Sequence, residues 1–302
     1  MDIQELKEII DCMPKGRTFF PYYQNRYAPM LLAWIIGEYG KVSDIKQSRY
    51  AGLLDKPPVK NLLATSGKGT LSADALSLAW AEPHDQFLLT LGQWGGDSPR
   101  WQQTSRAGYN LVLQLNVHEG YRKAFTKYLP EDYQYLLEYS FHPVLNKGER
   151  ELFRQTLGWV RMDIDFATGE ALIEEIQSDW IRDLQMLKKE CATDAKSKAM
   201  YHYSGFVIER FGKIWDEALL CAALWFLIEE MGLTTIWYHT FETGNQLKRI
   251  KYRQPPRSLY SKLPRKFCFT ETSDQPLFLS RDKSYRRFAR AYKEPRWFQM
   301  QM

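Results

Sequence analysis

The sequence has few cysteines and no apolar run long enough to span a membrane. Its four cysteines, Cys12, Cys191, Cys221 and Cys268, lie far apart and form no C-x-x-C pair, which argues against a disulfide framework and a zinc site. The longest apolar run, 218–228, is too short to cross a bilayer, and the first residues do not resemble a secretory leader. We therefore expect a cytoplasmic protein without a membrane partner; the sequence leaves the oligomeric state open.

Acidic residues are scarce in the last fifth of the chain. From Asn245 onward, fifteen lysines and arginines stand against four aspartates and glutamates, although the whole chain carries a net charge of only +5. Such a surplus favours an anionic partner, either nucleic acid or a phosphorylated cofactor, or it is a solvated surface without a specific ligand. Aromatic side chains lie between the basic ones and favour nucleic acid, because they stack on bases. The predicted nucleic-acid-binding residues are Lys248, Arg249, Arg253, Arg257, Arg286, Arg287 and Arg290.

The hydrophobic pattern changes near residue 85. Apolar segments at helical spacing dominate residues 1–85, whereas strand-like runs alternate with helices over residues 86–302. We predict an α+β fold: a helical N-terminal region (1–85), then an α+β domain (86–302) with a basic helix at 281–292 that either contacts nucleic acid or packs on its own domain. The expected helices are 3–12, 27–39, 59–65, 71–80, 118–128, 215–231 and 257–263. The expected strands are 87–94, 111–117, a hairpin over 159–179, 234–240, 267–270 and 276–280, with a polar connector from the hairpin to residue 214.

The hairpin contains the string EIQSDW and raises a question about two adjacent glutamates. With residues 168–169 at its tip, Met162 faces Glu175, so Glu175 extends the apolar face of the sheet. Glu174 then lies on the charged, solvated face. A carboxylate on an apolar face needs a partner or a ligand, and burial would raise its pKa toward that of a general base. We predict Glu175 as the catalytic base; the alternative is a structural ion pair with a core cation, for which Lys213 would serve.

The acidic residues of the hairpin also permit a metal site. Asp163, Asp165 and Glu174 share one face in the expected register, and Asp179 follows nearby. Such a cluster would favour a metal-dependent nuclease, although solvated acidic faces are far commoner. No histidine is tied to these residues by spacing, so we include no metal ligand in the predicted site.

The C-terminal 45% of the chain resembles a domain found in large polyvalent proteins of phages and conjugative elements. EIQSDW (175–180) matches the end of a strand in that domain, and LYSKLP (259–264) is similar to its Y-D-K-x-L-P segment. The resemblance implies a role in conflict between mobile elements and their hosts, with a phage or host protein as a possible partner class. The other matching positions are Phe211, Lys213, Trp215, Glu217, Thr243, Gly244 and Gln246.

The order of the predicted elements also resembles the GNAT acyltransferase superfamily. Asn245 and RSLYSKLPRKFCF (257–269) stand where that superfamily has N-x-x-A-x-x-L-Y-x-K-x-G-F. The resemblance implies a GNAT-like mixed sheet flanked by helices, with Glu175 as the base and Tyr260 as the acid of an acyl transfer. It also implies acetyl-CoA, but the superfamily's pyrophosphate loop, Q/R-x-x-G-x-G/A, has no match in 179–217.

These observations lead to one main hypothesis and two alternatives. The main hypothesis is an acyltransferase-like protein with Glu175 and Tyr260 as catalytic residues. The first alternative is a non-catalytic factor that binds nucleic acid or a protein through its basic C-terminal surface, and the second is the metal-dependent nuclease. His239 follows two aromatic residues on a strand and is either a site residue or a core histidine. The predicted substrate-binding residues are Gln177, Asp179, Trp180, Lys213, His239 and Asn245.

Overall fold

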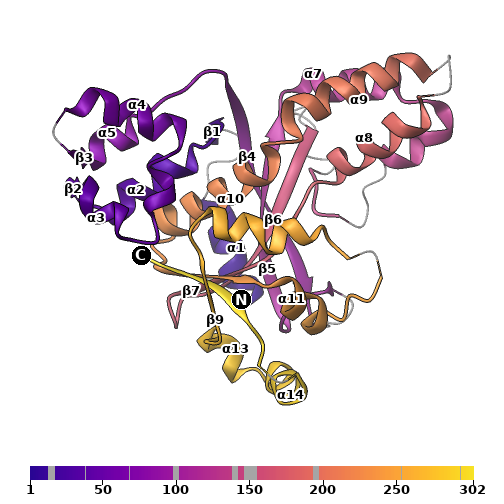
Figure 1. Cartoon of the computed structure of the whole chain (residues 1–302). Coiled ribbons are helices and arrows are strands. Elements are labelled where there is room, and N and C mark those ends of the chain that lie inside the picture. Colours follow the sequence, from indigo (N-terminus) through magenta and orange to yellow (C-terminus); the bar gives the residue numbers. More distant parts are fainter. Residues whose placement is uncertain are drawn as a thin grey trace.

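The computed structural model combines helices with a large mixed sheet, which confirms the predicted α+β class (Figure 1). None of its described helices is long and apolar enough to cross a membrane. Arg253, a predicted nucleic-acid-binding residue, lies outside the described residues. The described residues are 1–12, 18–37, 39–67, 69–97, 102–137, 142–145, 155–192, 197–252, 254–292 and 294–302.

The central sheet has eight strands. These are β1 (Thr18–Tyr23), β4 (His84–Gly96), β5 (Gly108–Val117), β6 (Gln155–Asp165), β7 (Glu170–Gln177), β8 (Thr235–His239), β9 (Thr270–Thr272) and β10 (Trp297–Gln301). Their order across the sheet is β1-β4-β5-β6-β7-β8-β10-β9. Neighbours are antiparallel except β7 and β8, which run parallel. That pairing ends at Ile173 and Tyr238, although β7 continues for four more residues, so the two strands part there.

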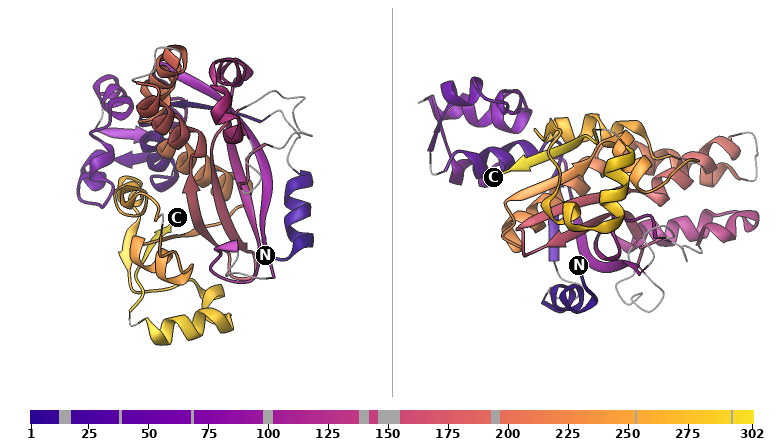
Figure 2. Two further views of the ribbon diagram at one scale, coloured as in Figure 1. Left: turned by 90° about the vertical axis from the view of Figure 1, so that its right-hand side faces the viewer. Right: turned by 90° about the horizontal axis from the view of Figure 1, so that it is seen from below.

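The region before residue 85 is joined to this sheet, because β1 pairs with β4 at its edge. α1 lies beside β4 and β5 (Figure 2). The segment expected to be a helix over 71–80 instead begins with a short strand, β3, which pairs with β2 in a separate ribbon. The elements of this region are α1 (Ile3–Cys12), α2 (Tyr27–Ile35), β2 (Tyr39–Lys41), α3 (Val42–Lys46), the 3-10 helix η1 (Ala51–Leu53), α4 (Pro57–Ser66), β3 (Thr70–Ser72) and α5 (Ala73–Ser77).

The expected polar connector after the hairpin forms two helices, which is a correction. In the first of them Ile181, Leu184 and Leu187 recur at helical spacing and are buried, while charged side chains cover the other face and hide the pattern. The buried helix that comes after these two, Trp215–Trp225, packs against β6 and β7. These elements are α7 (Glu119–Tyr128), the 3-10 helix η2 (Glu131–Leu137), α8 (Asp179–Glu190), α9 (Lys198–Phe211), α10 (Trp215–Trp225) and the π-helical turn η5 (Phe226–Glu230).

The C-terminal part also differs from expectation. Residues 276–280 were expected to form a strand, but a helix begins at Leu277, directly after Pro276, where proline is favoured because it has no N–H to donate. The sequence pattern did not reveal β10, which lies between β8 and β9 in the sheet. A second, smaller core beneath β7, β8 and β10 contains Leu172, Trp237 and Trp297. The helices here are α11 (Phe241–Leu247), the 3-10 helix η6 (Arg257–Tyr260), α12 (Lys262–Lys266), α13 (Leu277–Arg281) and α14 (Lys283–Ala291).

The register of the hairpin is the correction with the largest consequence. Four residues rather than two form the turn, and a β-bulge interrupts the pairing between Met162–Ile173 and Arg161–Glu175. An extra residue in one strand shifts the following side chains to the other face. Glu175 therefore faces Arg161 rather than Met162, and Glu174, which was expected to be solvated, is fully buried.

Candidate functional site

Arg161 is the buried cation that pairs with Glu175. Its guanidinium group forms an ion pair with the Glu175 carboxylate across the bulge. It also donates to the backbone oxygens of Gln102 at 2.9 Å and Gln103 at 3.1 Å, and it lies 5.1 Å from the Trp94 ring centre. The alternative interpretation of Glu175 as an ion-paired residue is thus correct in kind, although the partner is not Lys213, which is exposed.

Glu174 is the centre of a second buried network. Its carboxylate accepts from the backbone N–H and the hydroxyl of Ser105, both at 2.9 Å, and His239 Nε2 lies 3.1 Å from it. Burial raises the pKa of Glu174, but the hydrogen bond from His239 and the charges of Lys248 and Arg161 outweigh burial and lower that pKa to about 2. Glu174 is therefore a carboxylate at neutral pH.

His239 is a fully buried histidine rather than a group at the rim of a site. Burial lowers its pKa below the usual value, against the opposing effect of Glu174, so the ring is neutral at pH 7. Because its Nε2 faces a carboxylate, Nε2 carries the proton. Both Ser105 and Glu174 contact this same nitrogen, whereas a nucleophilic triad needs one of them on each nitrogen. The three residues thus form a structural network and not a hydrolase triad.

Lys248, Tyr260 and Asn245 meet where β7 leaves β8. The Lys248 ammonium donates to the backbone oxygen of Glu174 at 2.7 Å, and burial lowers the pKa of Lys248. Burial raises the pKa of Tyr260 well above its usual value, and the Glu175 carboxylate raises it further, so the phenol keeps its proton. A pocket of about 10 Å³, enough for one water, lies between them. It is lined by Glu175, Phe241, Gly244, Asn245, Lys248, Ile250, Pro255 and Tyr260.

Two of these side chains have buried polar atoms without a partner in the described part of the chain. Both amide atoms of Asn245 are in this state. The Tyr260 oxygen faces the backbone N–H of Ile176, but the hydroxyl proton has no acceptor. Because buried polar groups are nearly always hydrogen-bonded, this pair indicates a place for polar atoms of a ligand.

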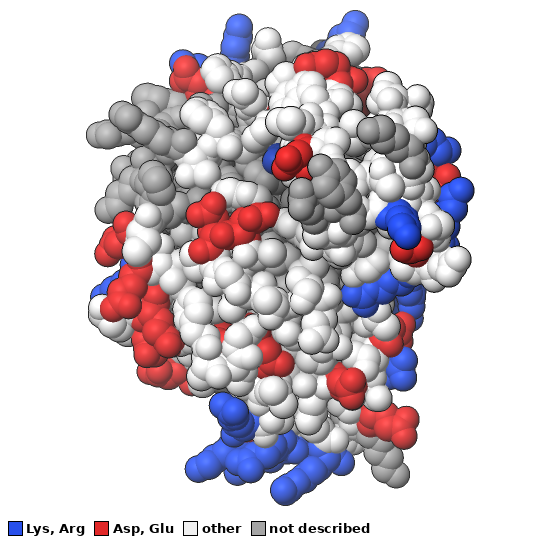
Figure 3. Space-filling model, turned by 90° about the vertical axis from the view of Figure 1, so that its left-hand side faces the viewer, with Lys and Arg blue, Asp and Glu red and all other residues white. Residues whose placement is uncertain are grey.

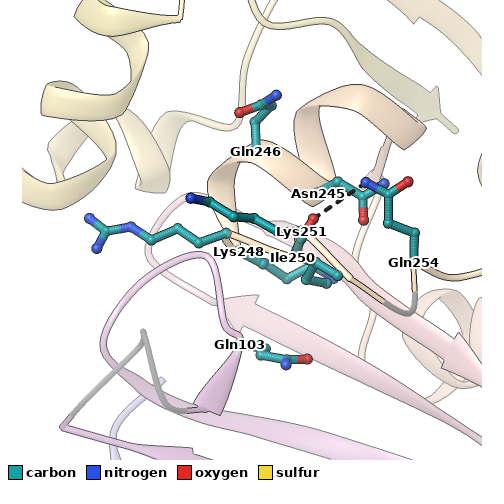
Figure 4. A pocket seen from close by; sticks show the side chains of 8 residues that line it. Gln103, Asn245, Gln246, Lys248, Ile250, Lys251 and Gln254 are labelled. Carbon is teal, nitrogen blue, oxygen red and sulfur yellow. Dashed lines mark hydrogen bonds between the residues drawn. The ribbon is translucent and has the colours of Figure 1, made fainter.

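A much larger groove opens beside the pocket and shares three of its lining residues. Its volume is about 820 Å³, within the range of ligand sites. In Figure 4, Gln103 lies across the groove from α11 and the segment that follows that helix. Three cations and no acid are among its lining residues, which are Gln103, Asn245, Gln246, Lys248, Arg249, Ile250, Lys251 and Gln254.

The second half of EIQSDW belongs to a separate cluster at the start of α8. The Asp179 carboxylate accepts from Trp159 Nε1 at 2.9 Å and Arg182 at 2.7 Å, and it lies 3.0 Å from His142 Nδ1. Gln177 bridges Asp179 and His142. These two predicted substrate-binding residues therefore lie together, but not on the pocket of Glu175 and Tyr260.

Trp180, Lys213 and Arg257 do not join the site. Trp180 is buried in the main core, where Tyr121 and Phe125 approach it edge-on, so its prediction as a substrate-binding residue is not supported by position. Lys213 is exposed at the start of the segment leading to α10. Arg257 forms an exposed ion pair with Glu242 instead of presenting a free charge.

The predicted nucleic-acid-binding residues divide between two places. Lys248 is buried and Arg249 lines the groove. Arg286, Arg287 and Arg290 are exposed on α14, and in Figure 3 basic side chains gather at the lower end of the molecule, where Figure 1 shows α14. These residues do not form one continuous interface along the C-terminal part.

The carboxylates considered for a metal site have other partners. Arg106 binds Asp163 through two nitrogens, at 2.7 and 2.9 Å, and Asp165 at 3.3 Å. Glu174 and Asp179 belong to the two networks described above. No set of three or more histidine, cysteine, aspartate or glutamate side chains is placed to hold a metal ion within the ranges that the structure describes.

Sequence reasoning missed several site residues. Ser105 and Gln103 lie in an irregular segment with no motif, and neither Arg161 nor Lys251 was among the predicted site residues. The sequence offered one signal for the changed register. Two adjacent glutamates interrupt an otherwise alternating strand, which is typical of a β-bulge. No family model, no curated protein and no solved structure matches this chain.

Proposed function

We propose that this protein is an acyltransferase-like enzyme related to the GNAT superfamily, and that its reacting groups meet between β7 and α11. The resemblance implies a mixed sheet flanked by helices, and the sheet of this protein contains one parallel pair of strands between antiparallel neighbours. β7 and β8 form such a pair, and they part after Ile173 and Tyr238. Glu175, the proposed base, and Tyr260, the proposed acid, line one pocket at that point.

The observation that carries the proposal is the unpartnered polar atoms in this pocket. Asn245 and Tyr260 are 7% and 3% exposed, yet they leave amide atoms and a hydroxyl proton without partners. Leaving such groups unpaired costs on the order of 1–3 kcal/mol each. A fold retains such an arrangement most readily where a substrate completes the hydrogen bonds.

In the proposed reaction an amine attacks the carbonyl carbon of an acyl donor. The new C–N bond forms as the bond from the acyl carbon to the leaving group breaks. Among the described residues, Glu175 is the acid that lines the pocket, and it takes the proton that the attacking amine loses. Tyr260 remains protonated because its pKa is raised, so it can donate a proton or a hydrogen bond to the leaving atom. Arg161 holds the Glu175 carboxylate in position through their ion pair.

The start of α8 does not fit the pyrophosphate that the resemblance would place there. The first turn carries Asp179, a buried carboxylate whose pKa is lowered by His142, Trp159 and Arg182 despite burial. One of the backbone N–H groups is already used, since Ile181 donates to the Ser178 hydroxyl. A pyrophosphate at this helix start would meet a negative charge instead of free donors. No step of the proposed reaction depends on a pyrophosphate at this place.

The test is to measure acyl transfer and binding separately. Acetyl-CoA and acetyl phosphate would be offered as acyl donors with a panel of amines, and acetyl-CoA and CoA binding would be followed by isothermal titration. We expect Glu175→Gln and Tyr260→Phe to lower turnover by at least about tenfold while binding remains. The control is Tyr203→Phe, a buried tyrosine whose hydroxyl donates to the Tyr121 carbonyl outside the site. Absence of transfer from both donors would overturn the proposal, as would equal activity of the two site variants and wild type.

One observation favours a second function. Arg286, Arg287 and Arg290 are exposed on α14, and no ion pair is recorded for them among the described residues. Exposed arginines on one helix can neutralise nucleic-acid phosphates. Binding of labelled single- and double-stranded DNA and RNA to wild type and to Arg286→Gln/Arg290→Gln would test this. An affinity that falls steeply with salt and falls again in the variant would support it, and equal affinities would exclude this helix as the interface.

A further inference from the structure

The groove beside the catalytic pocket has the charge of an anion site. Lys248, Arg249 and Lys251 line it, and its remaining lining residues are neutral. Arg249 and Lys251 are exposed, and no ion pair is recorded for either among the described residues. Since surface arginines and lysines in a concave site attract and bind phosphate groups, the groove favours a phosphorylated ligand.

Arg249 stands where the backbone favours glycine. It follows the last residues of α11 with φ of 58°, and the N–H of Ile250 donates to the Asn245 carbonyl at 2.8 Å. This is the helix ending in which a left-handed residue, usually glycine, closes the last turn. An arginine is unfavourable in this conformation. Arg249 therefore lowers the stability of the fold, but it places a cation on the groove. Such strain is often found at functional sites.

The opposite wall of the groove also contains a residue with left-handed backbone. Gln103 also has a positive φ, of 52°, and lies across the groove in Figure 4. Its backbone oxygen accepts from Arg161, the partner of Glu175. The wall of the groove is thus tied directly to the proposed base. At the inner end, the unpartnered Asn245 amide belongs to both the groove and the pocket.

From this geometry we infer that Lys248, Arg249 and Lys251 bind the phosphate groups of a nucleotide-like ligand whose reactive end reaches Glu175 and Tyr260. The inference rests on the proposed function for the role of the reactive end, but not for phosphate binding itself. The groove, at about 820 Å³, is large enough for such a ligand. Phosphates bind here rather than at the start of α8, where Asp179 stands. The shared chemistry is a di- or triphosphate, whether free or attached to a nucleoside.

The decisive variant is Arg249→Gly. Glycine relieves the left-handed backbone and removes the cation, so we expect a higher midpoint of urea unfolding together with weaker phosphate binding. Both quantities are measured on the full chain, by urea titration and by isothermal titration with inorganic pyrophosphate, ADP and CoA. We expect at least about a tenfold weaker affinity for each phosphorylated probe that wild type binds. Arg249→Gly/Lys251→Gln should lose more, and Arg286→Gln/Arg290→Gln, which removes two charges from α14, should change affinity less than about twofold.

The three probes separate the sources of the phosphate. Binding of pyrophosphate alone would assign the site to the phosphate groups, and binding of ADP or CoA without pyrophosphate would show that the nucleoside is also required. Unchanged affinity in Arg249→Gly would overturn the inference, as would failure of all three probes to bind wild type. If pyrophosphate and ADP bind but neither acyl donor reacts, phosphate binding stands and the proposed acyl transfer fails. If acyl transfer occurs and the groove variants do not affect it, the proposed acyl transfer stands and the phosphate site in the groove fails.

Discussion

Two regions at the same end of β7 differ in charge and in how completely their polar groups are used. At the start of α8, the Asp179 carboxylate has partners in Trp159, Arg182 and His142. Beside α11, Asn245 has none among the described residues, and the adjoining groove carries only positive charge. The Asp179 carboxylate is thus satisfied within the protein, whereas the Asn245 amide is the group for which we propose a ligand.

The two regions offer an anion different kinds of chemical group. A helix start binds phosphate only if its N–H groups are free and no acid stands before them. At α8 the Ser178 hydroxyl uses one N–H group, and Asp179 adds a negative charge. The segment after α11 carries two side-chain cations on the groove, Arg249 and Lys251. If phosphates bind there as we propose, their affinity depends on arginine and lysine and not on the peptide backbone.

The largest expected effect concerns the buried ion pair between the two regions. Arg161→Ala would leave Glu175 without its cation and the carbonyl oxygens of Gln102 and Gln103 without their donor. We expect the free energy of unfolding to fall by about 3–5 kcal/mol, measured by urea denaturation. Arg182→Ala is the matched control at the start of α8, where the arginine is 59% exposed and its loss should cost less than about 1 kcal/mol. Equal losses would show that the two regions do not differ in burial of charge.

The next effect is a loss of stability in acid on the groove side. Burial lowers the pKa of His239, so below its usual value of 6.5 the unfolded chain binds a proton that the folded chain does not, and stability falls. Glu174 has a pKa of about 2 when folded and an ordinary value of 4.5. Its contribution of about 3 kcal/mol is therefore present above pH 4.5 and is lost as the pH falls toward 2.

Urea unfolding at pH 7, 5.5, 4 and 3 would measure this dependence. Glu174→Gln keeps the shape of the side chain and removes its titration, so the slope of stability against pH below 5 should be smaller in this variant. A wild-type curve that is flat from pH 7 to 4 would contradict the burial of the His239–Glu174 pair.

Two buried asparagines test whether the groove side is incomplete. Asn116 donates to the Leu88 carbonyl at 2.9 Å and to Thr90 at 2.8 Å, and accepts from Thr156 at 2.8 Å. Asn116→Leu should therefore cost about 2–3 kcal/mol, because its partners stay buried and unpaired. Asn245→Leu removes two amide atoms that have no partner among the described residues, so it should raise stability by about 1–3 kcal/mol while it weakens ligand binding. A cost of 2 kcal/mol or more for Asn245→Leu would assign that amide to the structure of the apo protein.

The smallest expected effect is at the start of α8. Asp179→Asn keeps the contacts of one oxygen but replaces the other acceptor by a donor, so it should lower stability by about 1–2 kcal/mol. Affinity for pyrophosphate or ADP, measured by isothermal titration, should change less than about twofold. A tenfold gain in affinity would place the phosphates at α8 after all and would end the distinction between the two regions.

Much of the fold follows from local patterns. α1 and α10 have apolar residues at helical spacing, and β5 is a clear strand; each lies within a few residues of its expected position. α8 and α9 were missed because their exposed faces are so charged that the segment resembled a loop. β10 was missed because Trp297–Gln301 follows a long basic stretch without a turn signal, and its place is decided by pairing with β8.

The candidate site divides in the same way. Glu175, Asn245, Lys248 and Tyr260 were singled out from the sequence, and they line one pocket. The roles of Glu174 and Arg161 were not predictable, because a bulge reverses which side chains share a face. Asp179 and Gln177 are adjacent to Glu175 in the chain, yet the turn into α8 directs them to other partners.

The sequence by itself determined the α+β class, the buried helix α10 and the concentration of positive charge after residue 245, because each depends on composition or on local periodicity. Only the tertiary structure decided that Glu174 is buried beside His239, that Arg161 holds Glu175, and that part of the basic stretch lines a groove. These contacts join residues that are far apart in the chain. They depend on the bulge in β7 and on the point where the pairing of β7 with β8 stops. A displacement of one residue in the register would send the same side chains to the opposite face.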